Sequence, residues 1–134
     1  MIYHINRAKA KAEVTPEQIE AALESWRNQG RSNPAVKSFM VGRDLGGEFD
    51  YSCVFVVEDL DGLYEYLTHP ATIGTDHLGL ALLERLDIFD ISDDDDPDLY
   101  AKIEELHRRR STLNPEIPGM LSDVPEFRGA GAND

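Results

Sequence analysis

YLTHPATIGTDHLGLALLERLDIFDI, residues 66–91, is the stretch of sequence that decides the fold. Within it, His69-Pro70 predicts the end of a helix, because a proline disfavours the helical conformation of the residue before it. The Leu-rich segment 73–83 is typical of another helix, and the apolar run 86–91 is typical of a strand. Two helical segments separated by a corner and followed by a strand are therefore expected.

The residues before this stretch predict three strands and a further helix. Segment 1–8, with Ile2, Tyr3 and Ile5, and the apolar runs 36–41 and 51–57 are typical of strands, and the last is apolar on both faces. The sequence TPEQ at 15–18 predicts a helix start with a capping box, and Gly30 is the expected end of that helix. The resulting order is β-α-β-β-α-β, with the second helix in two parts.

This order predicts an α+β, ferredoxin-like fold with an antiparallel four-stranded sheet. In such a fold the helices cover one face of the sheet only. The chain offers no second set of four strands to cover the other face. A second copy of the same sheet is therefore the expected cover, and a homodimer is the expected assembly.

The C-terminal part of the chain is predicted to be an appendage to this domain. Five of the six residues 93–98 are aspartate, which suits an acidic linker that ends in a helix cap. A short helix is expected next, ending at Arg108-Arg109-Arg110, where the helix dipole favours cations. From residue 111 the chain is rich in Pro, Gly and Asp, so we expect a flexible tail or an extended segment along a partner. The predicted division is 1–92 and 93–134.

Composition excludes several classes of function. The formal net charge of −13 would repel nucleic acid and anionic membrane surfaces. No run of about 18 apolar residues predicts a transmembrane helix. No secretory signal is expected before the strand that starts the chain. A single cysteine, Cys53, allows no internal disulfide and suits a reducing cytoplasm.

His4 and Tyr66 are the candidate catalytic residues. His4 shares a strand face with Ile2 and Asn6, and a histidine has a pKa suited to acid/base work. The alternative for His4 is a structural histidine with satisfied hydrogen bonds. Tyr66, near the end of its helix, is placed to donate a hydrogen bond to a ligand oxygen, or else its ring packs and its hydroxyl reaches water.

Neither a metal nor a cofactor is expected. His69 is predicted to be a cap or turn residue, and His69, Asp76 and His77 match no metal-ligand spacing. The aspartate run lacks the glycine and terminal glutamate of a calcium-binding loop. The sequence contains no phosphate-binding glycine loop and no dinucleotide or flavin motif.

Four pieces of the sequence resemble the stress-responsive α/β barrel family, called Dabb, and its plant polyketide cyclases. They are His4 in the first strand, NPAVKSFMVGRD at 33–44, YSCVFVVEDLDGLYEYLTHPA at 51–71 and ERLDIFDI at 84–91. The resemblance covers roughly residues 1–92. It implies a ferredoxin-like fold whose copies pack sheet to sheet into a dimeric α/β barrel.

The cyclases act on poly-β-keto substrates with two histidines and a tyrosine. The resemblance matches His4 to the first histidine and Tyr66 to the tyrosine. Thr72 stands where the second histidine is found, since this chain has HPAT instead of HPAH. His77 would replace it only if the helix were reoriented, so the cyclase mechanism does not carry over intact.

Three functions follow as alternatives. The first is a cofactor-free cyclase or lyase for an oxygenated organic or polyketide-like substrate, with His4 as acid/base and Tyr66, and as a further option Lys37, orienting a carbonyl. The second is a cofactor-independent monooxygenase, and the third is a non-catalytic stress-response, ligand-binding or scaffold protein. The candidate substrate-contacting residues, which together would form a pocket for a small apolar or oxygenated ligand, are Leu23, Trp26, Lys37, Val54 or Val56, Thr72, Ile73 and Ile88.

Overall fold

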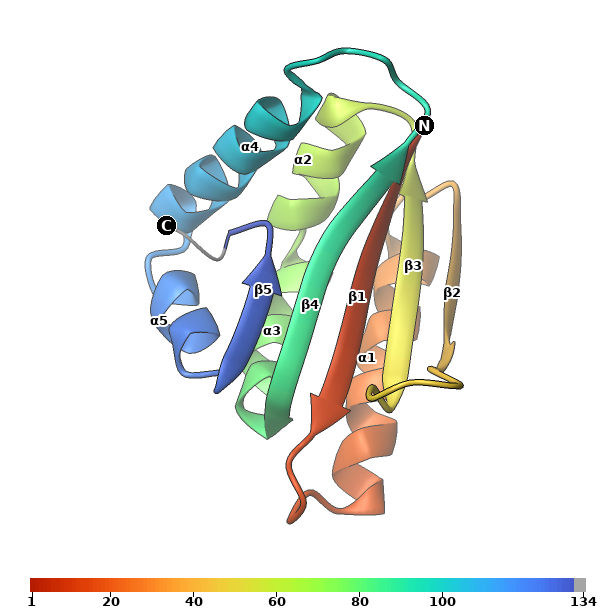
Figure 1. Cartoon of the computed structure of the whole chain (residues 1–134), viewed down its shortest axis with the longest axis vertical. Helices are drawn as coiled ribbons and strands as arrows, with labels where there is room; N and C mark the ends of the chain where they lie inside the picture. Colours follow the sequence, from red (N-terminus) through yellow and green to blue (C-terminus); the bar gives the residue numbers. More distant parts are fainter. Residues whose placement is uncertain (132–134) are drawn as a thin grey trace.

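The strands and helices follow the expected ferredoxin-like order, with additional elements at the C-terminal end (Figure 1). The structure is a computed structural model and describes residues 1–131. The N-terminal elements are β1 (Ile2–Ala10), α1 (Pro16–Ser32), β2 (Ser38–Arg43), β3 (Tyr51–Val57), α2 (Leu60–Thr68), α3 (Pro70–Gly79), the 3₁₀ turn η1 (Leu80–Leu82) and β4 (Leu83–Ser92). They are followed by α4 (Leu99–Leu113), α5 (Ile117–Ser122) and β5 (Glu126–Gly129).

Helix α1 begins where the capping box predicts. The Gln18 backbone N–H donates to the Thr15 hydroxyl at 3.2 Å, and the Gln18 side chain accepts from the Thr15 N–H at 2.9 Å. The predicted end at Gly30 is wrong, because α1 continues to Ser32. A side chain at Gly30 would overlap the Phe39 ring, with a Cβ only 2.2 Å from it. The glycine therefore allows α1 to lie close against β2.

The His69-Pro70 corner has the predicted geometry. His69 ends α2 in an extended conformation, and its Nδ1 accepts a hydrogen bond from the Ala71 N–H at 3.0 Å at the start of α3. The predicted role of His69 as a cap is confirmed. The helical segment is shorter than predicted, since β4 already begins at Leu83.

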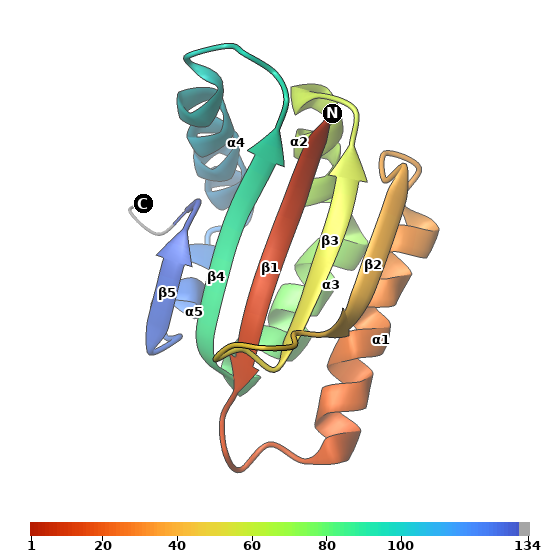
Figure 2. The same cartoon turned by 45° about the vertical axis from the view of Figure 1, so that its right-hand side comes forward.

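The sheet has the strand order β2-β3-β1-β4-β5. The first four strands are antiparallel, and β5 is parallel to β4. All the helices lie behind the sheet in the view of Figure 2, so its front face carries no helix. His4 of the central strand β1 lies opposite Phe55 of β3 on one side and opposite Asp90 of β4 on the other.

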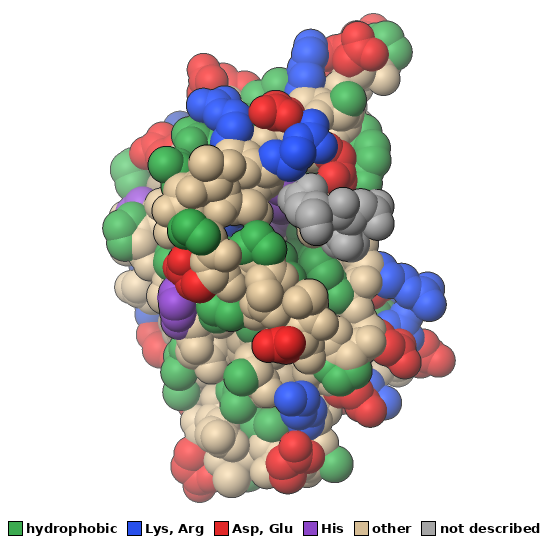
Figure 3. All heavy atoms as spheres, turned by 90° about the vertical axis from the view of Figure 1, so that its left-hand side faces the viewer, with side chains coloured by type: hydrophobic (Ala, Val, Ile, Leu, Met, Phe, Trp, Pro, Cys, Tyr) green, Lys and Arg blue, Asp and Glu red, His purple; other side chains and the backbone are tan. Residues whose placement is uncertain are grey.

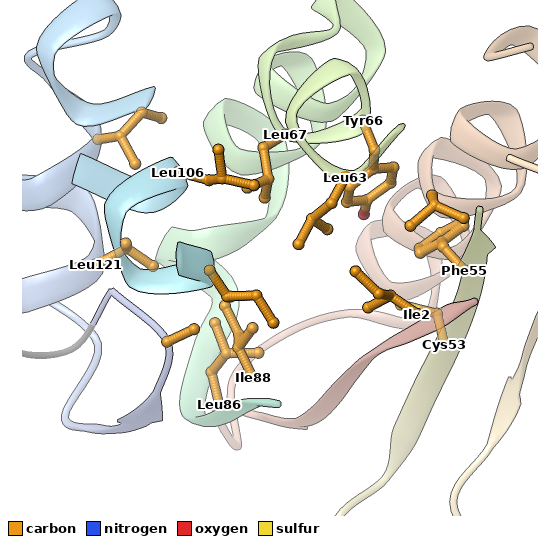
Figure 4. Packing of buried hydrophobic residues seen from close by; sticks show 14 of the residues in the cluster. Ile2, Cys53, Phe55, Leu63, Tyr66, Leu67, Leu86, Ile88, Leu106 and Leu121 are labelled. Carbon is orange, nitrogen blue, oxygen red and sulfur yellow. The ribbon is translucent and has the colours of Figure 1, made fainter. Parts of the chain in front are cut away.

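The segment after residue 111 is folded, where the sequence predicted a flexible or extended tail. The apolar side chains of α4, α5 and the turn after them extend the core beyond the sheet and α2 (Figure 4). Burial of these side chains compensates for the Pro- and Gly-rich composition that favours disorder. The buried ones are Ile103, Leu106, Ile117, Leu121 and Val124. Residues 132–134, also part of the predicted tail, lie outside the described residues.

Gly129 is required where the chain leaves β5. Its φ of 111° lies in the left-handed region that favours glycine. A Cβ at this position would lie 1.7 Å from the Ile88 carbonyl oxygen, which accepts a hydrogen bond from Ala130. The glycine thus brings the end of the chain against β4.

Part of the helix-free face of the sheet is apolar and exposed, whereas its other end carries Arg7 and Arg85, on which Phe49 of the β2–β3 loop packs. Tyr3, Met40, Phe89 and Ile91 on this face are between 38% and 71% exposed. Within residues 1–131, no helix has the length and apolar character needed to cross a membrane.

Candidate functional site

His4 and Asp90 form a buried pair on the helix-covered face of the sheet. They are opposite each other in the register of β1 and β4, and His4 Nδ1 lies 2.8 Å from Asp90 Oδ1. Both side chains are at most 9% exposed. A carboxylate that accepts a hydrogen bond from Nδ1 fixes the ring orientation and leaves Nε2 for proton transfer.

Tyr66 approaches His4 from α2, as the sequence predicted. The two ring centroids are 5.3 Å apart. The Tyr66 hydroxyl donates to Gln29 Oε1 of α1 at 2.6 Å, so it is not directed into empty space. Burial, foremost, raises the pKa of Tyr66, and the phenol therefore stays protonated at neutral pH. Gln29, which is also buried, was not identified from the sequence.

His107 of α4 supplies a second imidazole beside His4. The His4 and His107 ring centroids are 6.3 Å apart. Burial, together with the neighbouring His4, lowers the pKa of His107 to about 4, so its ring is neutral at pH 7. Its Nε2 is buried and has no hydrogen-bond partner among the described residues. The histidine ring that neighbours His4 thus belongs to the C-terminal helix α4.

Arg110 lies one turn after His107 on the same buried side of α4. It forms an ion pair with Asp76 of α3, although its own side chain is only 6% exposed. Burial lowers the pKa of Arg110 to about 10, which still leaves it cationic at pH 7. Thr72, one turn before Asp76 on α3, is buried, and its hydroxyl has no partner among the described residues.

His77 and Lys37 do not join this cluster. His77 is about half exposed, and its Nε2 lies 3.2 Å from Glu116. Lys37 is exposed before β2, and β3 separates β2 from the strand of His4. Val54 and Val56 also lie on the other side of the sheet, because they pair with Ile5 and Tyr3.

An apolar cavity of about 70 Å³ lies between α1, α3 and the sheet. Its lining includes three of the predicted pocket residues, Leu23, Trp26 and Ile88, but not Ile73, His4 or Tyr66. Its polar lining consists of Asn6, Tyr51, Thr75 and Asp76, with Trp26 at the helix side. Asn6 follows His4 on the same face of β1, and Asp76 pairs with Arg110, so the cavity adjoins the polar cluster.

The cluster combines an imidazole, a group able to carry a proton, with fixed polar groups. Asp90 orients His4, the neutral His107 and the protonated Tyr66 lie beside its ring, and the cationic Arg110 lies one turn along α4 from His107. This set can move one proton at His4 Nε2 and stabilise a negative oxygen that develops nearby. No group of three or more metal-binding side chains occurs within residues 1–131.

We expect the stability of the protein to fall as the pH is lowered from about 6.5 to about 4. Unfolded His107 takes up its proton near pH 6.5, whereas folded His107 does so only near pH 4. In that window the unfolded state therefore binds more protons, which favours unfolding. Thermal melts of the wild type and His107→Gln across pH 4–7.5 test this. Parallel pH profiles for the two proteins would contradict it.

Comparison with known proteins gives one family match and several similar folds. The family model described as "Stress responsive A/B Barrel Domain", Dabb, matches residues 2–93. A protein from Arabidopsis thaliana is 23% identical with a TM-score of 0.62, and the match covers 72% of this chain and 98% of that one. A dimeric ferredoxin-like protein of unknown function from Thermobifida fusca is 24% identical with a TM-score of 0.62, covering 68% and 89%.

A hydroxynitrile lyase from Passiflora edulis is 15% identical with a TM-score of 0.63, covering 71% of this chain and 94% of that one. At these identities the solved structures establish the fold alone. No curated protein matches the sequence. The family match ends near the end of β4, so α4, α5 and β5 lie outside it.

Proposed function

Because the chain belongs to the stress-responsive A/B barrel family, we propose that it is a homodimeric, cofactor-free acid/base enzyme, a lyase or cyclase. Its substrate is a small organic compound with a carbonyl or hydroxyl oxygen at the reacting carbon. His4 transfers the proton, Asp90 orients His4, and Tyr66 and His107 border the reacting oxygen.

The observation that carries this proposal is the His4–Asp90 pair, 2.8 Å apart and buried under the helices. A buried structural histidine needs one hydrogen-bond partner; the Tyr66 and His107 rings, 5.3 Å and 6.3 Å from the His4 ring, go beyond that need. Buried polar groups are retained against their desolvation penalty, and such clusters are frequent at functional sites. The hydroxynitrile lyase from Passiflora edulis has a similar fold, so lyase chemistry is compatible with this fold.

The apolar, helix-free face of the sheet supports the homodimer. Three of the similar solved structures are described as dimeric. Packing two such faces against each other would remove the exposed apolar side chains of Tyr3, Met40, Phe89 and Ile91 from water.

Phe89→Glu should dissociate this dimer. Phe89 is opposite Ile5 on the helix-free face and is 38% exposed in the single chain, so the new carboxylate would be solvated in a monomer and desolvated in a dimer. We expect the dissociation constant to rise about 30-fold or more, the loss typical of a central aromatic contact. Light scattering over a concentration series measures it.

Leu78→Glu on α3 is the matched control, since Leu78 is exposed on the helix side of the fold. It should leave the association unchanged. A wild-type protein that is monomeric at micromolar concentration would refute the homodimer itself.

The enzymatic proposal is tested by a screen of the purified protein, without added metal or cofactor, against aldehydes, hydroxynitriles and β-keto compounds. Turnover supports the proposal if its pH profile shows the titration of a single group and if it persists when a metal chelator is added. Saturable binding of these compounds without turnover excludes the enzymatic proposal and favours a non-catalytic ligand-binding protein.

The second candidate is a non-catalytic ligand-binding protein. Two observations favour it: the cavity of about 70 Å³ is not lined by His4, and the Tyr66 hydroxyl already donates to Gln29. Enzyme pockets for drug-sized ligands measure roughly 300–1,000 Å³. Catalysis in this protein therefore requires a very small substrate or an outward movement of the helices.

A further inference from the structure

We infer that the C-terminal helix α4 forms an internal binding site for the carboxylate of a small organic acid, with Arg110 as the binding group. The role of this site in holding a substrate rests on the proposed function. Binding of the carboxylate itself does not, because binding does not require turnover. It specifies the substrate class: a carboxylic acid with a small apolar body.

The first argument is the burial of Arg110. A guanidinium carries five N–H donors, and buried donors almost always have partners. Arg110 pairs with Asp76, yet its Nε is buried and has no partner among the described residues. Nε and the adjacent terminal nitrogen together form the side of a guanidinium that fits both oxygens of one carboxylate. That side is only partly used.

The second argument is that other unsatisfied groups gather around Arg110. The Thr72 hydroxyl and His107 Nε2 are both buried without partners in the described chain. Thr72 is one helical turn from Asp76 on α3, and His107 is one turn from Arg110 on α4, so both face the same interface. A hydroxyl, a neutral imidazole and a guanidinium can each donate a hydrogen bond to an oxyanion.

The charges around the site favour a monoanion over a phosphate. Arg110 is the cation of the cluster, and the carboxylates of Asp76, its ion-pair partner, and Glu116 are the acidic groups that act on it. The whole chain carries a formal net charge of −13. A dianion would meet this negative surrounding with a single guanidinium, whereas a carboxylate needs one positive charge only.

The apolar cavity accounts for the remainder of the ligand. Asp76 both pairs with Arg110 and lines the cavity, which otherwise consists mainly of Leu, Ile, Ala and Trp26 side chains. A ligand whose apolar body lies in the cavity therefore has its polar end beside Arg110. Displacing Asp76 from the guanidinium is feasible, because the Asp76 side chain is 20% exposed and water can solvate it.

Figure 3 shows the face of the molecule formed by this C-terminal part, where Lys and Arg side chains are interspersed with Asp and Glu side chains. Arg108 and Arg110 provide a matched pair for the experiment. Arg108 is on the same helix and about half exposed, with Glu105 as its partner, while Arg110 is buried. Both can be changed to methionine, which replaces the aliphatic stem of the side chain and removes the charged guanidinium.

The experiment measures binding of pentanoate and of 1-pentanol to the full chain at pH 7 by calorimetry and by amide chemical shifts. We expect pentanoate to bind at least about tenfold more tightly than the alcohol, with shifts at Thr72 and His107. Arg110→Met should remove the preference for the acid, and Arg108→Met should keep it. Equal binding of acid and alcohol, or an unchanged preference in Arg110→Met, would overturn the inference.

Arg110→Met also leaves Asp76 unpaired and can impair folding. The variant Asp76→Asn/Arg110→Met avoids the unpaired charge and should likewise show no preference for the acid. Pentanoate binding through Arg110 in a protein without turnover would uphold the anion site while refuting the enzyme. Turnover of neutral substrates without any anion binding would uphold the enzyme and refute the anion site.

Discussion

His4→Ala should lower turnover about 10²–10⁴-fold, the usual loss when a general acid/base is removed. The reason is positional: His4 is paired with Asp90 through Nδ1, so Nε2 is its nitrogen for proton transfer. Tyr66→Phe should reduce turnover less, because it removes a hydroxyl that already donates to Gln29 and keeps the ring against His4. Steady-state kinetics on the substrate found by the screen measure both effects.

His77→Ala is the matched control for this experiment. His77 is about half exposed and contacts Glu116, outside the polar cluster, so its removal should leave the rate unchanged. Circular dichroism of all variants separates loss of chemistry from loss of fold. Full activity in the His4→Ala protein would exclude His4 as the proton carrier.

Ile117→Ala should reduce the free energy of unfolding by about 2–5 kcal/mol, the range for truncating a buried isoleucine. Ile117 is the first residue of α5 and is 1% exposed, within the same apolar cluster as Leu63 and Leu67 of α2. The change leaves a cavity between the C-terminal elements and the sheet domain. Denaturant unfolding, followed by both fluorescence and circular dichroism, measures the loss.

Leu113→Ala provides the comparison, because Leu113 lies at the end of α4 and is 62% exposed. Its effect should stay within about 0.5 kcal/mol, as for most surface substitutions. If Ile117→Ala had an equally small effect, the C-terminal part would be only loosely attached, in line with the predicted short helix and flexible tail, and not part of the core.

Most of the ferredoxin-like fold could be predicted because its signals are local. The capping box at Thr15 and the cap at His69 are each set by residues within three positions. The uncovered face of the sheet followed from counting strands, and His4 and Tyr66 came together because strand order fixes which faces meet.

The second half of the site could not be predicted in this way. Arg110 was interpreted as a cation at a helix C-terminus, which is where exposed arginines are also found. Its burial depends on Asp76, which is distant in the sequence. One signal was present: Ile103, Leu106 and Arg110 recur at helical spacing, so the same stripe that buries the apolar residues also carries His107 and Arg110 inward.

The short β5 strand also determines how the sheet can associate with other strands. Open sheet edges are templates for aggregation, and proteins protect them with short strands, prolines and bulges. Beside β4, the pairing partner is a four-residue strand preceded by Pro125 and ended by the left-handed Gly129. Only β2, on the opposite edge, has a regular six-residue stretch free to accept another strand. Endless strand-to-strand growth needs two complementary open edges. Because the β5 edge of the described chain is short, its sheet disfavours fibrous polymerisation.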